Sequence, residues 1–69
     1  MGSWNRFVVR ERRFKSSAEM YLFLRVLGDR KISFGSANNE FHVKFYDDPL
    51  YPEYTYMSID KMARIACNK

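Results

Sequence analysis

The sequence is short of cysteine, histidine, glycine and long apolar runs, and each scarcity excludes a class of protein. A single cysteine, Cys67, allows no intramolecular disulfide, which favours a reducing, intracellular setting. With His42 as the only histidine, a structural His/Cys zinc site has too few ligands. The three glycines form neither a phosphate-binding loop nor a dinucleotide fingerprint. We therefore expect no metal and no cofactor.

The absence of a run of about 18 apolar residues excludes a membrane-spanning helix. The first residues also lack the apolar core of a signal peptide. We expect a cytoplasmic protein, located in the host cytoplasm if it is viral. A chain of 69 residues predicts one small domain, residues 1–69, whose core supplies only about 3–5 kcal/mol of net stability. That small core makes a homo-oligomer one of the expectations.

The segment from Ser16 to Gly28 has the clearest helical pattern in the chain. Ser16 and Glu19 form a capping box, in which the Ser16 hydroxyl bonds the amide of Glu19. Gly28 is suited to the left-handed conformation that ends a helix. The predicted apolar face consists of Met20, Phe23, Leu24 and Leu27, widened by Tyr21, Leu22 and Val26.

Alternating side chains predict strands on both sides of this helix. The first strand is expected over residues 4–14, with Phe7 and Val9 facing the helix. Residues 31–34 and 40–47 are expected to form a hairpin around a loop of about five residues, 35–39. In the second hairpin strand Phe41, Val43 and Phe45 point to one side and the polar residues to the other.

The C-terminal third is expected to contain a loop, a further strand and a helix. Two prolines and the Asp47–Asp48 pair predict turns in which the aspartates either cap backbone amides or approach one cation, and we favour capping. Residues 54–57 fit a third strand of the hairpin sheet, and Ser58 caps a helix from residue 59 to about 68. The predicted fold is α+β, with order β-α-β-β-(β)-α and two helices packed on one face of a small antiparallel sheet.

From Ser17 onward this order resembles that of double-stranded-RNA-binding domains. That family places a lysine cluster at the start of its last helix, where this chain has Lys61 beside Asp60. The proline and histidine of the family's first hairpin loop are absent from residues 35–39. The resemblance is confined to the order and length of the elements and carries over no site residue.

The chain carries more basic than acidic residues, and three of its arginines lie in the predicted first strand. Twelve lysines and arginines against eight acidic residues give a net charge of +4, which raises the expectation of an anionic partner. Arg6, Arg10 and Arg12 share one face of the first strand with Trp4 at its end. This stripe is either solvated surface or an anion-binding site with an aromatic platform for stacking.

Tyrosines and prolines are concentrated between residues 50 and 56. Such rigid, amphipathic surfaces are enriched in binding sites, and Tyr51 is the best candidate for an exposed contact. Tyr54 is either a second contact or a strand residue whose ring enters the core. In a nucleotide or nucleic-acid binder these rings stack on bases while arginines hold phosphates.

Three functions follow from these patterns. The first is a non-enzymatic binder of nucleic acid or a nucleotide through Trp4, Arg6, Arg10, Arg12, Tyr51 and Tyr54. The second is an inhibitor or adaptor of the kind found in phages and mobile elements, which grips a host protein through the tyrosine-rich loop. The third is a small metal-independent ribonuclease in which His42 or Tyr46 moves protons and arginines hold the phosphate, with Lys44 as a further candidate. We favour the first, and expect no catalytic residue.

Overall fold

The computed structural model describes residues 7–68 of the chain. Trp4 and Arg6, two of the predicted contact residues, lie outside the described residues. The elements, in chain order, are β1 (Val8–Phe14), α1 (Ser17–Leu27), the single 3-10 turn η2 (Gly28–Arg30), β2 (Lys31–Ala37), β3 (Glu40–Asp47) and α2 (Ile59–Cys67).

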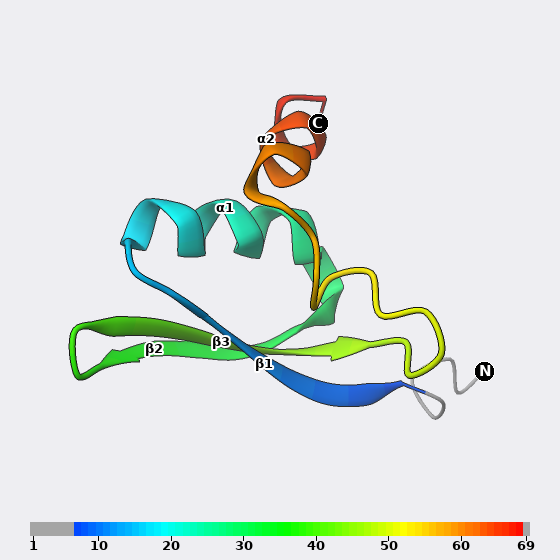
Figure 1. The fold of residues 1–69 in the computed structure, drawn as a ribbon, viewed down its shortest axis with the longest axis horizontal. Coiled ribbons are helices and arrows are strands. Elements are labelled where there is room, and N and C mark those ends of the chain that lie inside the picture. Colours follow the sequence, from blue (N-terminus) through cyan, green and yellow to red (C-terminus); the bar gives the residue numbers. More distant parts are fainter. Residues whose placement is uncertain (1–6, 69) are drawn as a thin grey trace.

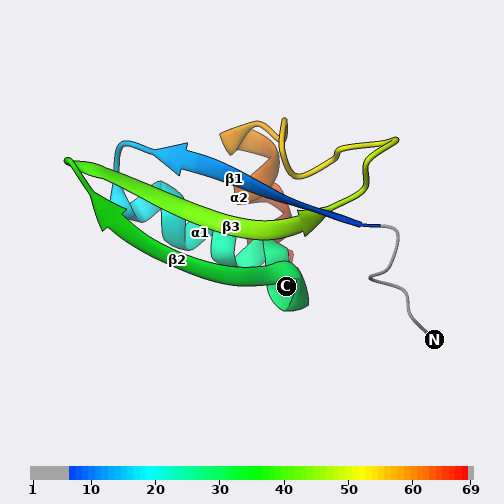
Figure 2. The same ribbon diagram turned by 90° about the horizontal axis from the view of Figure 1, so that it is seen from below.

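The three strands form one antiparallel sheet in the order β1-β3-β2, and both helices lie on the same side of it (Figure 1). α1 packs on β1 and β3, while α2 packs on α1. No helix of the described residues covers the other face of the sheet, as the view from below shows (Figure 2). The α+β class and the order β-α-β-β-α are therefore confirmed.

Both helices begin at the residues that the capping patterns predict. The Ser16 hydroxyl accepts a hydrogen bond from the Glu19 amide at 3.2 Å, and the Ser58 hydroxyl accepts one from the Lys61 amide at 3.1 Å. Gly28 ends α1 with a positive φ of 59° and donates its amide to the Leu24 carbonyl.

The β2–β3 hairpin differs from the prediction in the length of its loop. β2 continues to Ala37, and only Asn38 and Asn39 connect it to β3. Both asparagines have positive φ, at 54° and 65°, which is the backbone of a two-residue turn whose twist matches that of the strands. The predicted five-residue loop is wrong because the asparagine pair makes the reversal alone.

Residues 54–57 form turns and no strand, so the predicted third hairpin strand is wrong. The reason is that β1 occupies that place beside β3, with Val8 paired to Asp47 and Phe14 paired to Phe41. A strand from residues 54–57 has no free edge of β3 to join. The order α-β-β-β-α, on which the resemblance to double-stranded-RNA-binding domains rested, is therefore absent.

The face that β1 turns toward the helices is the opposite of the predicted one. Phe14 is buried and its ring lies 5.2 Å from that of Phe23 in α1, so the alternation of the strand places Arg10 and Arg12 on the helix side. Val9, predicted to face the helix, lies on the open face of the sheet. The large ring of Phe14 decides the orientation of the whole strand.

The hydrophobic core lies between the sheet and α1 and continues under α2. Phe23 is central, because its ring contacts Phe14 and lies 5.1 Å from the ring of Phe45 in an edge-to-face arrangement. Within the described residues the buried apolar set is Phe14, Met20, Phe23, Val26, Leu27, Val43, Phe45, Met57 and Met62.

Candidate functional site

The loop between β3 and α2 is anchored by the last residue of β3. Asp47 is 1% exposed, and its carboxylate accepts hydrogen bonds from the Thr55 amide at 2.8 Å and the Thr55 hydroxyl at 2.6 Å. It also accepts the amide of Asp48 at 2.9 Å. The Asp47 side chain at the end of the sheet thus fixes the position of Thr55, eight residues further along the chain.

Asp47 is ionised in this position. Burial opposes ionisation, but the hydroxyl of Thr55 and the amides of Thr55, Asp48 and Tyr54 all donate to the carboxylate. Together these hydrogen bonds hold the pKa of Asp47 below its ordinary value. The buried group is consequently a fixed negative charge whose acceptor oxygens are engaged by the loop.

Asp48 folds the first part of the same loop. One of its carboxylate oxygens accepts the amide of Leu50 at 2.9 Å and the amide of Tyr51 at 3.3 Å. This is the turn chemistry expected of an aspartate before a proline, and the predicted capping role of Asp47 and Asp48 is confirmed. The turn directs Leu50 and Tyr51 away from the protein, since both are highly exposed.

The second part of the loop is fixed by two arginines. Arg12 donates a hydrogen bond from Nη1 to the Tyr54 carbonyl at 3.0 Å. The guanidinium of Arg30 lies 4.8 Å from the ring centre of Tyr54 and 4.9 Å from that of Phe7, so it contacts both rings. Met57 then enters the core, which closes the loop before α2 begins.

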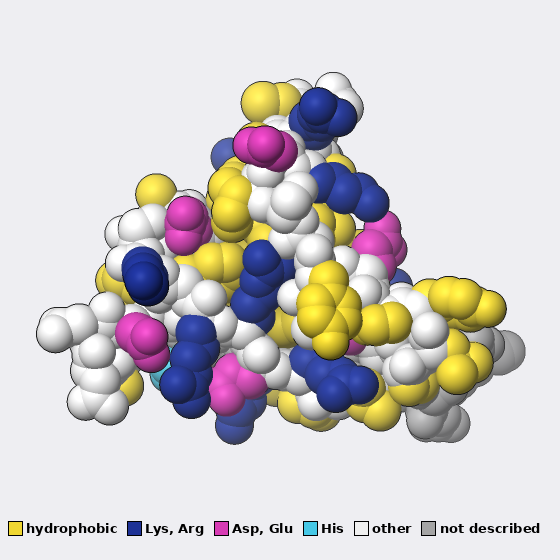
Figure 3. Space-filling view, viewed as in Figure 1, with side chains coloured by type: hydrophobic (Ala, Val, Ile, Leu, Met, Phe, Trp, Pro, Cys, Tyr) yellow, Lys and Arg dark blue, Asp and Glu magenta, His cyan; other side chains and the backbone are white. Residues whose placement is uncertain are grey.

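We call residues 48–57 the tyrosine loop. It exposes three large side chains with apolar surface: Leu50 at 76%, Tyr51 at 79% and Tyr56 at 79%. Hydrophobic side chains gather along the part of the surface where this loop follows β3 (Figure 3). Because several hydrogen bonds fix its backbone, the loop presents these side chains in a defined arrangement and loses little conformational freedom on binding.

The charges of the tyrosine loop itself are all acidic. Asp48 and Glu53 are the charged residues between positions 48 and 57, and no lysine or arginine occurs there. Glu53 pairs with Lys61 of α2 at 3.7 Å. The segment itself therefore contributes two carboxylates and no cation.

The predicted arginine stripe is divided by the fold. Arg10 is exposed, whereas Arg12 is half-buried, with its guanidinium 5.2 Å from the ring centre of Phe14 and 5.3 Å from that of Phe23. Burial lowers the pKa of Arg12, and the nearby carboxylate of Glu19 acts in the opposite direction. The main contacts of Arg12 are thus inside the protein, where it supports the tyrosine loop.

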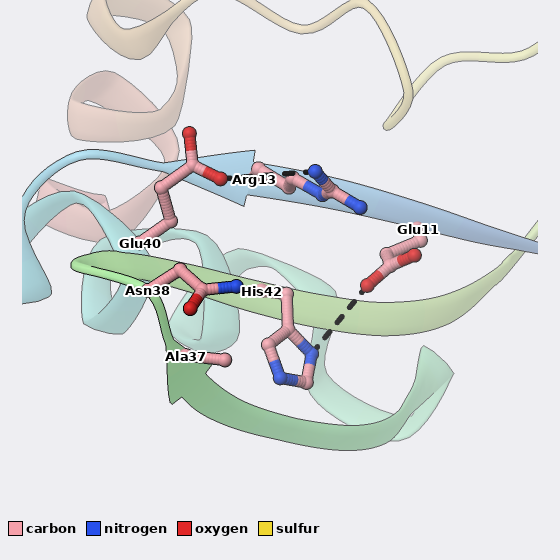
Figure 4. Close-up of a pocket in the computed structure, with 6 residues that line it drawn as sticks. All are labelled: Glu11, Arg13, Ala37, Asn38, Glu40 and His42. Carbon is pink, nitrogen blue, oxygen red and sulfur yellow. Dashed lines mark ion pairs between the residues drawn. The ribbon is translucent and has the colours of Figure 1, made fainter.

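A second group of polar side chains lies on the open face of the sheet, near the hairpin turn (Figure 4). Glu11 and Arg13 of β1 lie beside Glu40 and His42 of β3, around a cavity of about 230 Å³. His42 Nδ1 lies 3.5 Å from a Glu11 oxygen, and Arg13 lies 3.7 Å from Glu40. Each of these two β1 side chains thus faces a polar side chain of β3.

The imidazole of His42 occupies the space above Gly35 of β2. A Cβ at position 35 would stand 3.3 Å from His42 Nε2, so the lack of a side chain there allows this ring position. His42, Lys44 and Tyr46 share the open face, as their alternation predicts. Arg10 and Arg12 lie on the helix side, so the sheet separates the predicted proton-transfer residues from these two arginines.

Sequence reasoning identified most of the loop but missed two residues that hold it. The prolines, the tyrosines and the aspartate pair are visible in the sequence, and Tyr51 was expected to be exposed. Thr55 and Arg30 were not identified, because their partners are distant in sequence. Tyr54, predicted as a contact residue, is half-buried and packs its ring against Arg30.

Comparison with protein-family models, with curated proteins and with solved structures finds no match. None of the helices in residues 7–68 is long and apolar enough to cross a membrane. Over the same residues, no group of three or more histidine, cysteine, aspartate or glutamate side chains is placed to hold a metal ion.

Proposed function

We propose that this chain is a non-enzymatic protein-binding module, an inhibitor or adaptor, and that the tyrosine loop is its contact surface. The observation that carries the proposal is the exposure of Leu50, Tyr51 and Tyr56 on a backbone fixed by Asp47 and Asp48. Tyrosines supply large contact area at low entropic cost and dominate the energetics of many interfaces.

The local charge favours a protein over a nucleic acid. A polyanion needs free cations beside the aromatic rings, because phosphate contacts supply most of the affinity. The tyrosine loop offers Asp48 and Glu53 instead. Arg12 and Arg30, the arginines that contact the loop, are engaged by the Tyr54 carbonyl and by aromatic rings.

The expected partner surface follows from the same residues. Leu50 and Tyr51, adjacent on one turn, fit an apolar hollow, while the tyrosine hydroxyls need hydrogen-bonding groups at its edge. The partner surface need not be basic, because Asp48 accepts loop amides and Glu53 is paired with Lys61. Binding of an anionic ligand stays a prediction, for which exposed Arg10 is the remaining candidate on β1.

The carboxylates beside His42 support a non-enzymatic role. The His42 imidazole lies beside Glu11, and Arg13, on the same open face, is paired with Glu40. A ribonuclease site would need a proton-transfer group and a free phosphate-binding cation beside one substrate, whereas here His42 and Arg13 each face a glutamate. We therefore place binding ahead of catalysis.

The test is a comparative capture from a cell lysate, using immobilised wild-type protein and two matched variants. Tyr51→Ala removes a ring of the tyrosine loop, and Tyr21→Ala removes a ring that is 56% exposed on α1. We expect one partner to be retained by the wild type and Tyr21→Ala and lost from Tyr51→Ala, at low and high salt alike. Equal retention by all three proteins would contradict the proposal.

A further inference from the structure

The two outer strands of the sheet differ in how their free edges are protected. β1 carries Arg10, Glu11, Arg12 and Arg13 among its seven residues, and the tyrosine loop contacts it through the bond from Arg12 to the Tyr54 carbonyl. Charged side chains and covering loops are the usual protection against pairing with another chain. The edge formed by β1 is therefore protected against pairing with another strand.

β2 lacks such protection over most of its length. Lys31 begins the strand and a bulge at Ile32 follows it, but residues 33–37, with the sequence Ser-Phe-Gly-Ser-Ala, carry neither charge nor proline. These five residues pair regularly with β3 on one side. On the other side, the outward-facing backbone groups of an edge strand are available to a further strand.

Phe34 adds an exposed apolar side chain to the unprotected edge of β2. It is paired with Val43 and so lies on the helix side of the sheet, yet it is 47% exposed whereas Val43 is fully buried. The difference arises because α1 packs on β1 and β3 and leaves β2 less covered. The ammonium of Lys31, 5.5 Å from the ring centre, covers only part of Phe34.

We propose that β2 pairs antiparallel with β2 of a second copy of this chain, about a two-fold axis at Gly35. This register places Ser33 opposite Ala37 and Phe34 opposite Ser36, and uses all five regular residues. Both Phe34 rings then lie on the helix side of the joined sheet, diagonal to each other and within contact range. The result is a six-stranded sheet, β1-β3-β2-β2-β3-β1.

The charge pattern selects a second copy as the occupant of this edge. A two-fold interface brings each patch against itself, so a charged strand would place like charges opposite each other. Residues 33–37 avoid this because they carry no charge. The tyrosine loop contacts β1, the opposite edge of the sheet, so it would remain exposed in both copies.

Sedimentation equilibrium over a wide concentration range tests the pairing, with wild type, Phe34→Lys and the matched control Val9→Lys. Val9 is 57% exposed on β1, so both variants place a lysine at an exposed apolar position of an edge strand. We expect a concentration-dependent wild-type dimer, at least a tenfold weaker one for Phe34→Lys, and no change for Val9→Lys. Circular dichroism checks that both variants fold.

A cysteine exchange tests the register independently of stability. In a Cys67→Ser background, Ser33→Cys mixed with Ala37→Cys should form a mixed disulfide, because directly opposite residues lie about 4.5–5.5 Å apart. The proposal would be overturned if the wild type is monomeric, if Phe34→Lys dimerises with unchanged affinity, or if Val9→Lys loses the dimer. Failure of the mixed disulfide to form would overturn the register.

Discussion

Asp47 and Thr55 form the closest polar contact that holds the tyrosine loop, with the threonine hydroxyl 2.6 Å and its amide 2.8 Å from the same carboxylate oxygen. Asp47 ends the central strand of the sheet, and Thr55 lies three residues before the cap of α2. The contact therefore joins the sheet to the segment that leads into the last helix. Its loss should affect both stability and the shape of the loop.

Replacing Asp47 by asparagine should lower the free energy of unfolding by about 2–3 kcal/mol. Hydrogen bonds to a charged group contribute about 1.5–3 kcal/mol, and the amide of asparagine cannot accept all the bonds that the carboxylate accepts. Urea unfolding followed by circular dichroism measures the loss. Asp48→Asn is the control, because Asn retains the acceptor that caps Leu50 and Tyr51, and it should stay within about 0.5 kcal/mol of wild type. Equal losses in the two variants would contradict the anchoring role of Asp47.

The stability contributed by Asp47 should disappear in acid. Its pKa is lower in the folded protein than in the unfolded chain, where it is about 3.9. The contribution is then fully present above the unfolded pKa and is lost as the pH falls through the folded one. We expect the difference in unfolding free energy between wild type and Asp47→Asn to shrink below about pH 4. A difference independent of pH would show that ionisation of Asp47 is irrelevant.

The two arginines of β1 should respond differently to truncation. Arg12→Ala removes the bond to the Tyr54 carbonyl and the packing over Phe14 and Phe23, so we expect a loss of about 1–2 kcal/mol. Arg10→Ala, at an exposed site, should change stability by less than about 0.5 kcal/mol. Thermal unfolding of the pair measures the contrast. An Arg12→Ala variant as stable as wild type would contradict the supporting role of Arg12.

Replacing Gly28 by alanine should destabilise the protein because of the backbone conformation at this position. Its φ is 59° and its ψ is −119°, a region essentially restricted to glycine, while a Cβ there would meet no atom within 4 Å. Gly28→Ala should therefore cost about 1–3 kcal/mol through strain, measured by urea unfolding. If the variant is as stable as wild type, α1 ends in another way.

Local patterns in the sequence predicted the helices and the central hairpin strand, because caps and alternation act over a few residues. Ser16, Ser58 and the residues of β3 are examples. The alternation of β1 alone did not predict which of its faces packs against the helices. Phe14 lies on one face and Phe7 and Val9 on the other, so either face offers apolar side chains to the core. The path of residues 54–57 depends on β1 occupying the edge of β3, which is a long-range contact. The tyrosine loop was visible from its composition, but its anchors Thr55 and Arg30 were not.

The central claim is that the tyrosine loop binds a protein through its exposed rings. Its most direct test is the dissociation constant of the captured partner, measured by biolayer interferometry at low and high salt. We predict that Tyr51→Ala weakens binding by about tenfold or more, corresponding to at least about 1.4 kcal/mol, with little effect of salt. Tyr21→Ala and Arg10→Ala should leave the constant within about twofold. The opposite result would contradict the claim and identify an anionic ligand instead. In that case Arg10→Ala weakens binding, affinity falls steeply with salt, and Tyr51→Ala leaves the dissociation constant unchanged.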